Sequence, residues 1–545
     1  MRLVHLQVVR GAYLAGIAQR QQLATIALEP HRGRLLDRRG RPLAINVEAT
    51  SIYAVPAAIS DPGAFAARVG PVLGLSTEEL VRRLARGRYF VWLARKVRPE
   101  VVARMKALDL DEQIGYRVED LRAYPNGALA AHVLGFVGID NQGLAGVELR
   151  YDGLLRGRPG EAVAAHDGMG RILVETQRIV EAPVDGSDLL LTIDQVVQHI
   201  AERALEGAMS RTHARAGLVA AMDVRSGEIL ALALRPTFVP AAAGTAAPER
   251  WVNRAISEVY EPGSTFKVIL AAAAVDSGAV RPTETFACPG FLRVGDRIIR
   301  DAGGRRHGAQ TLGDVIKNSC NVGSAQVATR LGRVVFSRYV RAFGFGTPTR
   351  VDLPGEVGGL VPPLQGWAPP TLQTISFGQG ISVTPVQLLA AVAALGNGGW
   401  LPRPHVVRAV RDPAGRLTAA ADGRPARRVV RAETAAAVLA MMVKVVEEGS
   451  GRLARIDGYQ VAGKTGTAQK AAPRGGYDPD RYVASFVGIV PADAPRLAIL
   501  AILDEPHGAY YGSEVAAPVF REVASQTLWY LRIPPRTGVG RPFPP

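Results

Sequence analysis

Ser264 and Lys267 are the first residues whose types and spacing suggest chemistry. They lie in the stretch Glu-Pro-Gly-Ser-Thr-Phe-Lys at residues 261–267, and the apolar run at 268–275 predicts a buried helix that begins at this turn. Ser264 would lie at the helix N-terminus, with Lys267 one turn further along the same face. A neutral amine there can take the proton of the serine hydroxyl while its oxygen attacks an acyl carbon. A single Ser-x-x-Lys pattern is more often only an N-cap serine followed by a surface lysine.

The use of lysine in this chain favours the chemical interpretation. The chain has 65 basic residues, and only seven of them are lysines, at positions 96, 106, 267, 317, 444, 464 and 470. Arginine therefore serves where positive charge alone is needed. A guanidinium cannot act as a base because its pKa lies above about 12, so a retained lysine at position 267 indicates a task that only an amine performs.

Two further motifs follow in the order that acyl-transfer chemistry needs. Ser319 and Asn321 form a Ser-x-Asn motif, and residues 464–467 read Lys-Thr-Gly-Thr. Ser-x-x-Lys, Ser-x-Asn and Lys-Thr-Gly in this order are the signature set of penicillin-binding proteins and serine β-lactamases. Each motif is weak by itself, whereas three well-separated motifs in the right order are a strong signal.

The sequence also resembles the class B penicillin-binding proteins of the division and sporulation type, FtsI and its SpoVD-like relatives, over almost the whole chain. In the catalytic half the resemblance rests on residues 260–267, 464–470, 485–488 and 516–520. In the first half it rests on stretches similar to the family's non-catalytic pedestal, at residues 31–44, 122–125, 131–135 and 143–148. The resemblance implies a peptidoglycan D,D-transpeptidase that forms an acyl-enzyme on D-alanyl-D-alanine, joins the acyl group to a neighbouring amine, and is acylated by β-lactams.

The resemblance assigns roles to the first two motifs. Ser264 would be the nucleophile and Lys267 its general base, which requires that burial or a nearby cation lower the pKa of Lys267. Ser319 would relay a proton between Lys267 and the leaving amine. Asn321 would bond to a substrate amide and position Lys267, although an asparagine in such a place more often caps a turn.

The Lys-Thr-Gly-Thr motif would bind the substrate. Lys464 is expected to be a fixed positive charge for a substrate carboxylate or for tuning the relay serine. Gly466 would let a substrate backbone lie against the strand edge, beside Thr465. The family implies an oxyanion hole made by the backbone N–H groups of Ser264 and Thr467.

A glycine-rich segment supplies the last candidates, Gly378, Gln379 and Gly380. It resembles the segment that lies beside the cleft in the family. A plain helix start explains it about as well, because serine, threonine and proline follow at residues 382–385.

We expect an α+β protein with two domains. Residues 31–180 are predicted to form a pedestal or dimerisation-type domain of mixed strands and helices. Residues 181–533 are predicted to form a transpeptidase domain with a central antiparallel sheet flanked by helices. Residues 1–30 would be a juxtamembrane helical segment, and residues 534–545 a Pro-rich tail.

The central sheet is inferred from short strand signals at both ends of the second domain. A hairpin is predicted around Arg-Ser-Gly at residues 225–227, and further strand-like runs lie at residues 189–193, 459–462, 482–490 and 497–503. An amphipathic helix capped by Asp194 and a closing helix at about 513–531 would flank the sheet.

Composition bounds the function without deciding it. The 545 residues are 48% hydrophobic and 21% charged, which is typical of a globular protein. The net charge of +16 suits an anionic membrane or wall polymer, or reflects a preference for arginine codons, and no nucleic-acid motif accompanies the basic patches. Cys288 and Cys320 give no zinc spacing, so we expect no metal, no cofactor, and free packed thiols rather than a disulfide.

The N-terminal residues point to the membrane. No apolar run reaches the roughly 18 residues of a span, but one helical stripe is formed by Leu3, Leu6, Val9, Tyr13 and Ile17. We expect the reading frame to extend upstream and to encode about 20 apolar residues. The product would be a single-pass protein of the bacterial cytoplasmic membrane, with its catalytic domain on the outer side.

The expected partners follow from the resemblance. They are nascent peptidoglycan stem peptides, β-lactams as inhibitors, a membrane glycan polymerase of the FtsW type and other division proteins, but not nucleic acid. Two rival functions stay open. A β-lactamase or β-lactam sensor would need a second base, and no Glu-x-x-x-Asn stretch lies between Ser319 and Lys464. An inactive division scaffold would disagree with three intact motifs.

Overall fold

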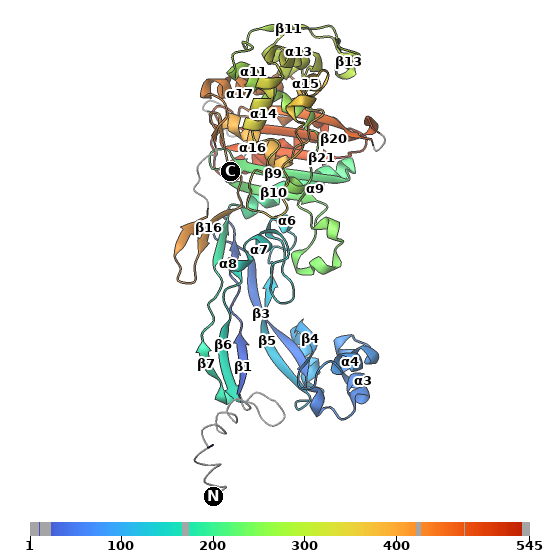
Figure 1. Cartoon of the computed structure of the whole chain (residues 1–545), viewed down its shortest axis with the longest axis vertical. Coiled ribbons are helices and arrows are strands. Elements are labelled where there is room, and N and C mark those ends of the chain that lie inside the picture. The colour runs from blue at the N-terminus through green and yellow to red at the C-terminus, as the bar shows by residue number, and fades with distance from the viewer. Residues whose placement is uncertain (1–9, 11–22, 166–173, 421–426, 473–474, 537–545) are drawn as a thin grey trace.

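The computed structural model describes residue 10 and residues 23–165, 174–420, 427–472 and 475–536. Figure 1 shows an elongated molecule, with a narrow N-terminal half built on long strands and a wider C-terminal half. The predicted α+β architecture is confirmed. The helical stripe expected at residues 3–17 lies outside the described residues. None of the helices in the described part combines the length and apolar character that a membrane crossing needs.

The first described element is a strand. β1 (Leu23–Leu28) pairs antiparallel with β6 (Gly160–Ala165), which in turn pairs with β7 (Arg178–Glu181). The expectation of a helical segment up to residue 30 is therefore wrong for β1. Its β-branched Thr25 and Ile26 suit a strand, and β6 supplies the hydrogen-bonding partner that a local helical pattern cannot reveal.

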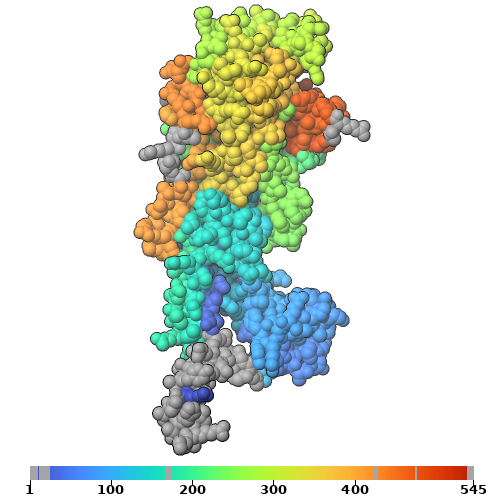
Figure 2. All heavy atoms as spheres, viewed as in Figure 1, coloured from blue at the N-terminus to red at the C-terminus, as the bar shows by residue number. Residues whose placement is uncertain are grey.

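The long strands of the pedestal carry a separate lobe at their far end, which Figure 2 shows standing out beside them. The strands are β3 (Pro42–Ala54), β4 (Val91–Val97) and β5 (Ile114–Ala123), and the lobe adds α3 (Pro62–Leu73), α4 (Thr77–Leu84) and α5 (Pro99–Lys106). Asp61 and Ser76 cap the first two helices through their side chains. Phe65 and Leu80 pack with Ile52 of β3 in a core of their own.

Glycine-rich stretches form the junction between the two halves. They contain α6 (Ala131–Leu134), α7 (Gly146–Arg150) and α8 (Asp152–Leu155). A Cβ on Gly135 would lie 1.8 Å from the Ala145 carbonyl oxygen, and one on Gly143 would lie 1.9 Å from that of Glu148. These glycines allow the two backbones to approach closely, and no other residue type fits there.

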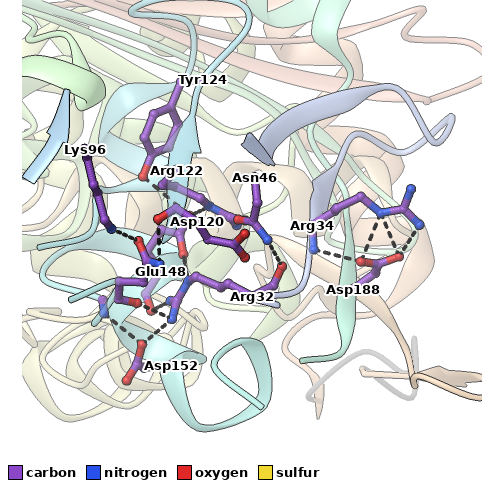
Figure 3. Close-up of polar contacts among 12 residues, drawn as sticks. Arg32, Arg34, Asn46, Lys96, Asp120, Arg122, Tyr124, Glu148, Asp152 and Asp188 are labelled. Atoms are coloured by element: carbon purple, nitrogen blue, oxygen red, sulfur yellow. Dashed lines mark hydrogen bonds and ion pairs between the residues drawn. The ribbon is translucent and has the colours of Figure 1, made fainter. Parts of the chain in front are cut away.

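A buried carboxylate joins the segments of this junction, as Figure 3 shows. Glu148 receives Arg32 Nε on one oxygen and Arg122 Nε on the other, each at 2.7 Å. Arg32 also reaches Asp152 at 2.6 Å, and Arg122 donates to Asn46 Oδ1 at 2.9 Å. The Glu148 side chain is 0% exposed and that of Arg32 is 2% exposed, so these charges depend on one another for compensation.

Glu148→Gln therefore leaves two buried guanidinium groups without their shared negative charge. We expect a loss of about 3–5 kcal/mol in the free energy of unfolding, measured by urea denaturation. Glu258→Gln is the matched control, because Glu258 makes a half-exposed ion pair with Arg254 at 3.5 Å and should change stability by less than about 1 kcal/mol. Equal stability of the two variants would contradict a structural role for the junction carboxylate.

The catalytic half is built on a five-stranded antiparallel sheet in the order β10-β9-β21-β20-β19. Its strands are β9 (Ala216–Asp223), β10 (Ile229–Arg235), β19 (Ala462–Ala471), β20 (Tyr477–Val490) and β21 (Leu497–Asp504). The predicted hairpin around residues 225–227 is confirmed. The strand expected at residues 459–462 is wrong, because Gly458 turns the chain there with φ +81° and β19 begins only at Ala462.

Helices cover both faces of this sheet (Figure 1). One face packs on α9 (Gln195–Thr212) and α19 (Ala517–Tyr530), and the other on α11 (Lys267–Asp276), α16 (Pro385–Gly396) and α17 (Ala432–Glu447). The closing helix expected as one element is two, α18 (Gly512–Val515) and α19, which meet at Ala516. Pro518 lies in the first turn of α19, where its missing N–H is tolerated.

The two halves share a second sheet. The predicted strand at residues 189–193 is β8 (Asp188–Leu191), but it does not join the catalytic sheet. It pairs in parallel with β2 (Leu35–Leu36) and antiparallel with β16 (Val407–Arg411), which is followed by β17 (Leu417–Ala419). Backbone hydrogen bonds therefore tie the pedestal to the catalytic half.

Candidate active site

Ser264 lies where the chain turns into the central buried helix. A 3₁₀ helix at Gly263–Phe266 precedes α11, which begins at Lys267, so the serine sits just before the α-helix rather than at its first turn. Gly263 has φ +56°, a backbone conformation that favours glycine. The predicted buried helix is confirmed, because the side chains from 267 to 274 are all buried.

Lys267 is completely buried and is held by the Ser-x-Asn segment. Its Nζ donates to Asn321 Oδ1 at 2.7 Å and to the backbone oxygen of Ser319, and lies 3.4 Å from Ser319 Oγ. Burial lowers the pKa of Lys267 to about 8, while the electrostatic interactions with Asp301 and Cys320 act in the opposite direction. A lowered pKa is the condition that a base at this position has to meet.

Ser319 approaches Lys267 from the loop after α12 (Leu312–Lys317), and Asn321 approaches it as the first residue of α13 (Asn321–Leu331). Ser319 has φ +57°, which costs a non-glycine residue about 1–3 kcal/mol and is typical of functional sites. The Asn321 amide binds Lys267 and the Arg300 carbonyl, whereas the Cys320 thiol caps α13 by accepting from Gly323 N–H. The structure thus disfavours the turn-capping alternative for Asn321.

Lys464 reaches the same hydroxyl from β19. It is fully buried. Its Nζ donates to Ser319 Oγ at 2.9 Å and to the backbone oxygen of Thr465 at 3.1 Å. Burial and the nearby Lys267 cation both lower the pKa of Lys464 well below its ordinary value. Two buried amines therefore compete for protons there, and the fixed positive charge expected of Lys464 stays a prediction.

Gly466 packs β19 against the turn at residues 261–266 that carries Ser264, called the Ser264 turn below. A Cβ at Gly466 would lie 2.3 Å from Ser485 Oγ and 2.9 Å from Thr265 Cγ2. The space that the missing side chain frees is filled by the protein and not left for a substrate, which corrects the reason given for this glycine. β19 is nevertheless the edge strand of the sheet, as that interpretation required.

The two threonines of the motif hold neighbouring segments. The Thr465 hydroxyl lies 3.0 Å from Ser450 Oγ, and Thr467 Oγ1 accepts from Gly512 N–H at 3.0 Å. These bonds fix the first part of β19 beside the Ser264 turn without using the Thr467 backbone N–H.

The glycine-rich segment lies directly against the Ser264 turn. Gly263 N–H donates to the Gly378 oxygen at 3.2 Å, and Gly380 N–H donates to Glu261 Oε1 at 2.8 Å. A Cβ on Gly378 would lie 2.2 Å from Gly263 O, so the close approach requires glycine. The side chain of Gln379 between them is partly buried. α16 starts separately at Pro385, after a capping box on Thr384, which favours a place beside the cleft over a plain helix start.

Sequence reasoning missed two features of the site, namely the contact that Asp301 makes and a group of possible metal ligands. Asp301 accepts from Asn321 N–H at 2.8 Å, although it lies in no motif and no spacing marks it. Cys288 and Cys320 are both buried free thiols, as predicted. However, the exclusion of a metal counted cysteines alone, and the donor atoms of Cys288, Asp301 and Cys320 lie within 4.8 Å of one another.

The buried Lys267 predicts how acylation depends on pH. A general base has to be neutral, so we expect the second-order rate constant for acylation by a β-lactam to rise about tenfold per pH unit below the pKa of about 8 and to level off above it. Stopped-flow measurement with a chromogenic β-lactam that does not titrate in this range gives the profile. A rate constant that stays flat across this range would contradict a neutral Lys267 as the base.

Comparison with known proteins agrees with this geometry. Residues 217–525 match the family model "Penicillin binding protein transpeptidase domain", and residues 27–191 match "Penicillin-binding Protein dimerisation domain". Stage V sporulation protein D of Bacillus subtilis is 37% identical over 98% of this chain and 84% of its own length. Peptidoglycan D,D-transpeptidase FtsI of Escherichia coli K12 is 33% identical over 98% of this chain and 89% of its own.

Solved structures show the same fold. A peptidoglycan synthetase from Bifidobacterium adolescentis has a TM-score of 0.76 at 28% identity, covering 96% of this chain and 99% of its own. Penicillin-binding protein 3 from Mycobacterium tuberculosis, complexed with aztreonam, has a TM-score of 0.74 at 29% identity, covering 94% and 98%. The chain therefore belongs to the class B penicillin-binding proteins, D,D-transpeptidases in which a dimerisation domain precedes the transpeptidase domain.

Proposed function

We propose that this protein cross-links peptidoglycan through an acyl-enzyme on Ser264, with Lys267, Ser319, Asn321 and Lys464 as the other catalytic residues. The observation that carries the proposal is the convergence of two buried lysines on one hydroxyl. Lys464 Nζ lies 2.9 Å from Ser319 Oγ, and Lys267 Nζ lies 3.4 Å from it. Lys267 is also three residues from Ser264 across a single tight turn.

In the first half-reaction, neutral Lys267 takes the Ser264 proton while Oγ bonds to the carbonyl carbon of the penultimate D-alanine. The backbone N–H groups of Ser264 and Thr467 would stabilise the oxyanion. Ser319 passes a proton from the lysine pair to the departing amine, the C–N bond breaks, and D-alanine leaves. An amine of a neighbouring stem peptide then attacks the ester carbon, and an amide bond forms as the C–O bond to Ser264 breaks. The proton that the amine loses passes through the lysine pair to the Ser264 oxygen.

The substrate would lie along β19, whose outer edge has no strand partner among the described residues. An extended peptide can pair with such an edge, beside Thr465 and Gly466. Lys464, protonated when a carboxylate arrives, would neutralise the terminal carboxylate. Gly378, Gln379 and Gly380 would border the cleft on the side of the Ser264 turn.

The biological setting belongs to the same proposal. Relatives named for sporulation and for FtsI support a role in septal or spore wall synthesis, and they favour transpeptidation over the β-lactamase and scaffold alternatives. Residues 31–180 would act as the pedestal and residues 181–533 as the catalytic domain. We place the enzyme at the outer side of the cytoplasmic membrane, beside a glycan polymerase of the FtsW type and other division proteins.

Ser264→Ala tests the nucleophile. We expect the variant to fold normally and to lose covalent labelling by a fluorescent penicillin, because no oxygen remains to form the ester. Ser277→Ala is the matched control at the other end of α11. Among the described residues, Ser277 Oγ bonds to local backbone groups alone, so this variant should label fully. Full labelling of Ser264→Ala would sink the assignment.

Lys267→Arg tests the base, since arginine keeps the charge but cannot be neutral. We expect the rate constant of acylation to fall at least about a hundredfold. Lys317→Arg provides the control. Lys317 lies near the Ser-x-Asn motif, three residues before Cys320, but its amine pairs with Asp314 at 3.0 Å. If Lys267→Arg acylates as fast as Lys317→Arg, the role of Lys267 is electrostatic only.

A further inference from the structure

Four metal-ligand side chains gather behind the Ser-x-Asn segment, outside the groups that carry acyl transfer. Cys288 ends β11 (Thr285–Cys288), Asp301 follows β13 (Arg297–Arg300), and Cys320 precedes α13, and all three are at most 5% exposed. Their donor atoms lie within 4.8 Å of one another. His307, just before β14 (Gly308–Thr311), places Nε2 2.9 Å from Asp301 Oδ2.

We propose that Cys288, Asp301, His307 and Cys320 bind a zinc ion. Two thiolates, a carboxylate and an imidazole are the donors that tetrahedral zinc prefers, at about 2.0–2.3 Å from the ion. Two donors on one tetrahedral ion are then roughly 3.3–3.7 Å apart. Cys288 Sγ lies 3.7 Å from Asp301 Oδ2, and the His307–Asp301 separation of 2.9 Å is close to this range.

Burial raises the pKa of the free Cys320 thiol to about 12, but N–H groups beside its sulfur act in the opposite direction. Its sulfur accepts from Gly323 N–H at 3.1 Å. Gln310 Nε2 is buried beside the same sulfur, and it meets the criteria for a hydrogen bond with none of the described residues. N–H groups aimed at a sulfur stabilise its anionic, metal-binding form, and such outer contacts are a regular part of metal sites.

A metal here would position the catalytic loop. Cys320 lies between Ser319 and Asn321 in the chain, and the other oxygen of Asp301 accepts from Asn321 N–H at 2.8 Å. Figure 1 shows β11, β13 and α13 together at the end of the molecule farthest from the N-terminus. Zinc would tie these separate segments to the loop that holds Ser319 in its strained backbone conformation. The four residues are thus metal ligands and positioning residues, not catalytic ones.

Metal analysis of the full chain tests the proposal. Protein purified without chelators should contain about one zinc ion per chain by elemental mass spectrometry, and cobalt substitution should give thiolate-to-metal charge-transfer absorption. Cys288→Ser should weaken that absorption. Competition with a chromophoric chelator should show that His307→Gln lowers zinc affinity by about 10- to 100-fold.

His405→Gln is the matched control, since His405 is a buried histidine that bonds to a backbone oxygen away from the cluster. Circular dichroism checks that each variant is folded. Zinc affinity of the unaltered chain weaker than about 1 μM would overturn the site, as would equal affinities of the two histidine variants, or a Cys288–Cys320 disulfide found by alkylation and mass spectrometry. These measurements do not depend on transpeptidation, so their failure would leave the proposed activity untouched.

Discussion

The structure depends on burying two lysine amines within reach of one serine hydroxyl. Moving an ammonium group out of water costs several kcal/mol unless partners compensate, and here the partners are few. Among the described residues, Lys267 is held by Asn321 and the Ser319 carbonyl, and Lys464 by Ser319 Oγ and Thr465. The part of this cost that the partners do not compensate lowers the pKa of both lysines. A lowered pKa makes a buried amine reactive, because more of it is neutral.

The scaffold around this site has to be stiff, because the three motifs come from three separate segments of the chain. α11 supplies Lys267, the α12–α13 loop supplies Ser319, and β19 supplies Lys464. Missing side chains make the approach possible: Gly466 admits Thr265, and Gly378 admits the backbone of Gly263. A Cβ atom at either glycine would push these segments apart. The pedestal is joined to the catalytic half farther from the site, through β8, β2 and the Glu148 junction.

Much of the site could be predicted from the sequence, because motif order and residue type are local information. Ser264, Lys267 and the Ser-x-Asn motif were recognisable from spacing, and so were the buried helix and the hairpin at residues 225–227. Burial and pairing partners were not: β1 became a strand because β6 lies beside it, and the charge of Lys464 depends on Lys267 in space. Asp301 was invisible for the same reason, since it meets Asn321 only after folding.

The outer edge of β19, which has no strand partner among the described residues, would fix the register of a peptide that pairs with it. Successive residues of an extended chain advance by about 3.3 Å and alternate in direction, so a one-residue slip turns every group to the wrong side. Lys464 and the Ser264 turn lie at fixed positions along this edge. A peptide bound there as proposed, with its terminal carboxylate at Lys464, would present one particular peptide bond to Ser264. The strand would then fix how many residues separate the cleaved bond from the end of the peptide.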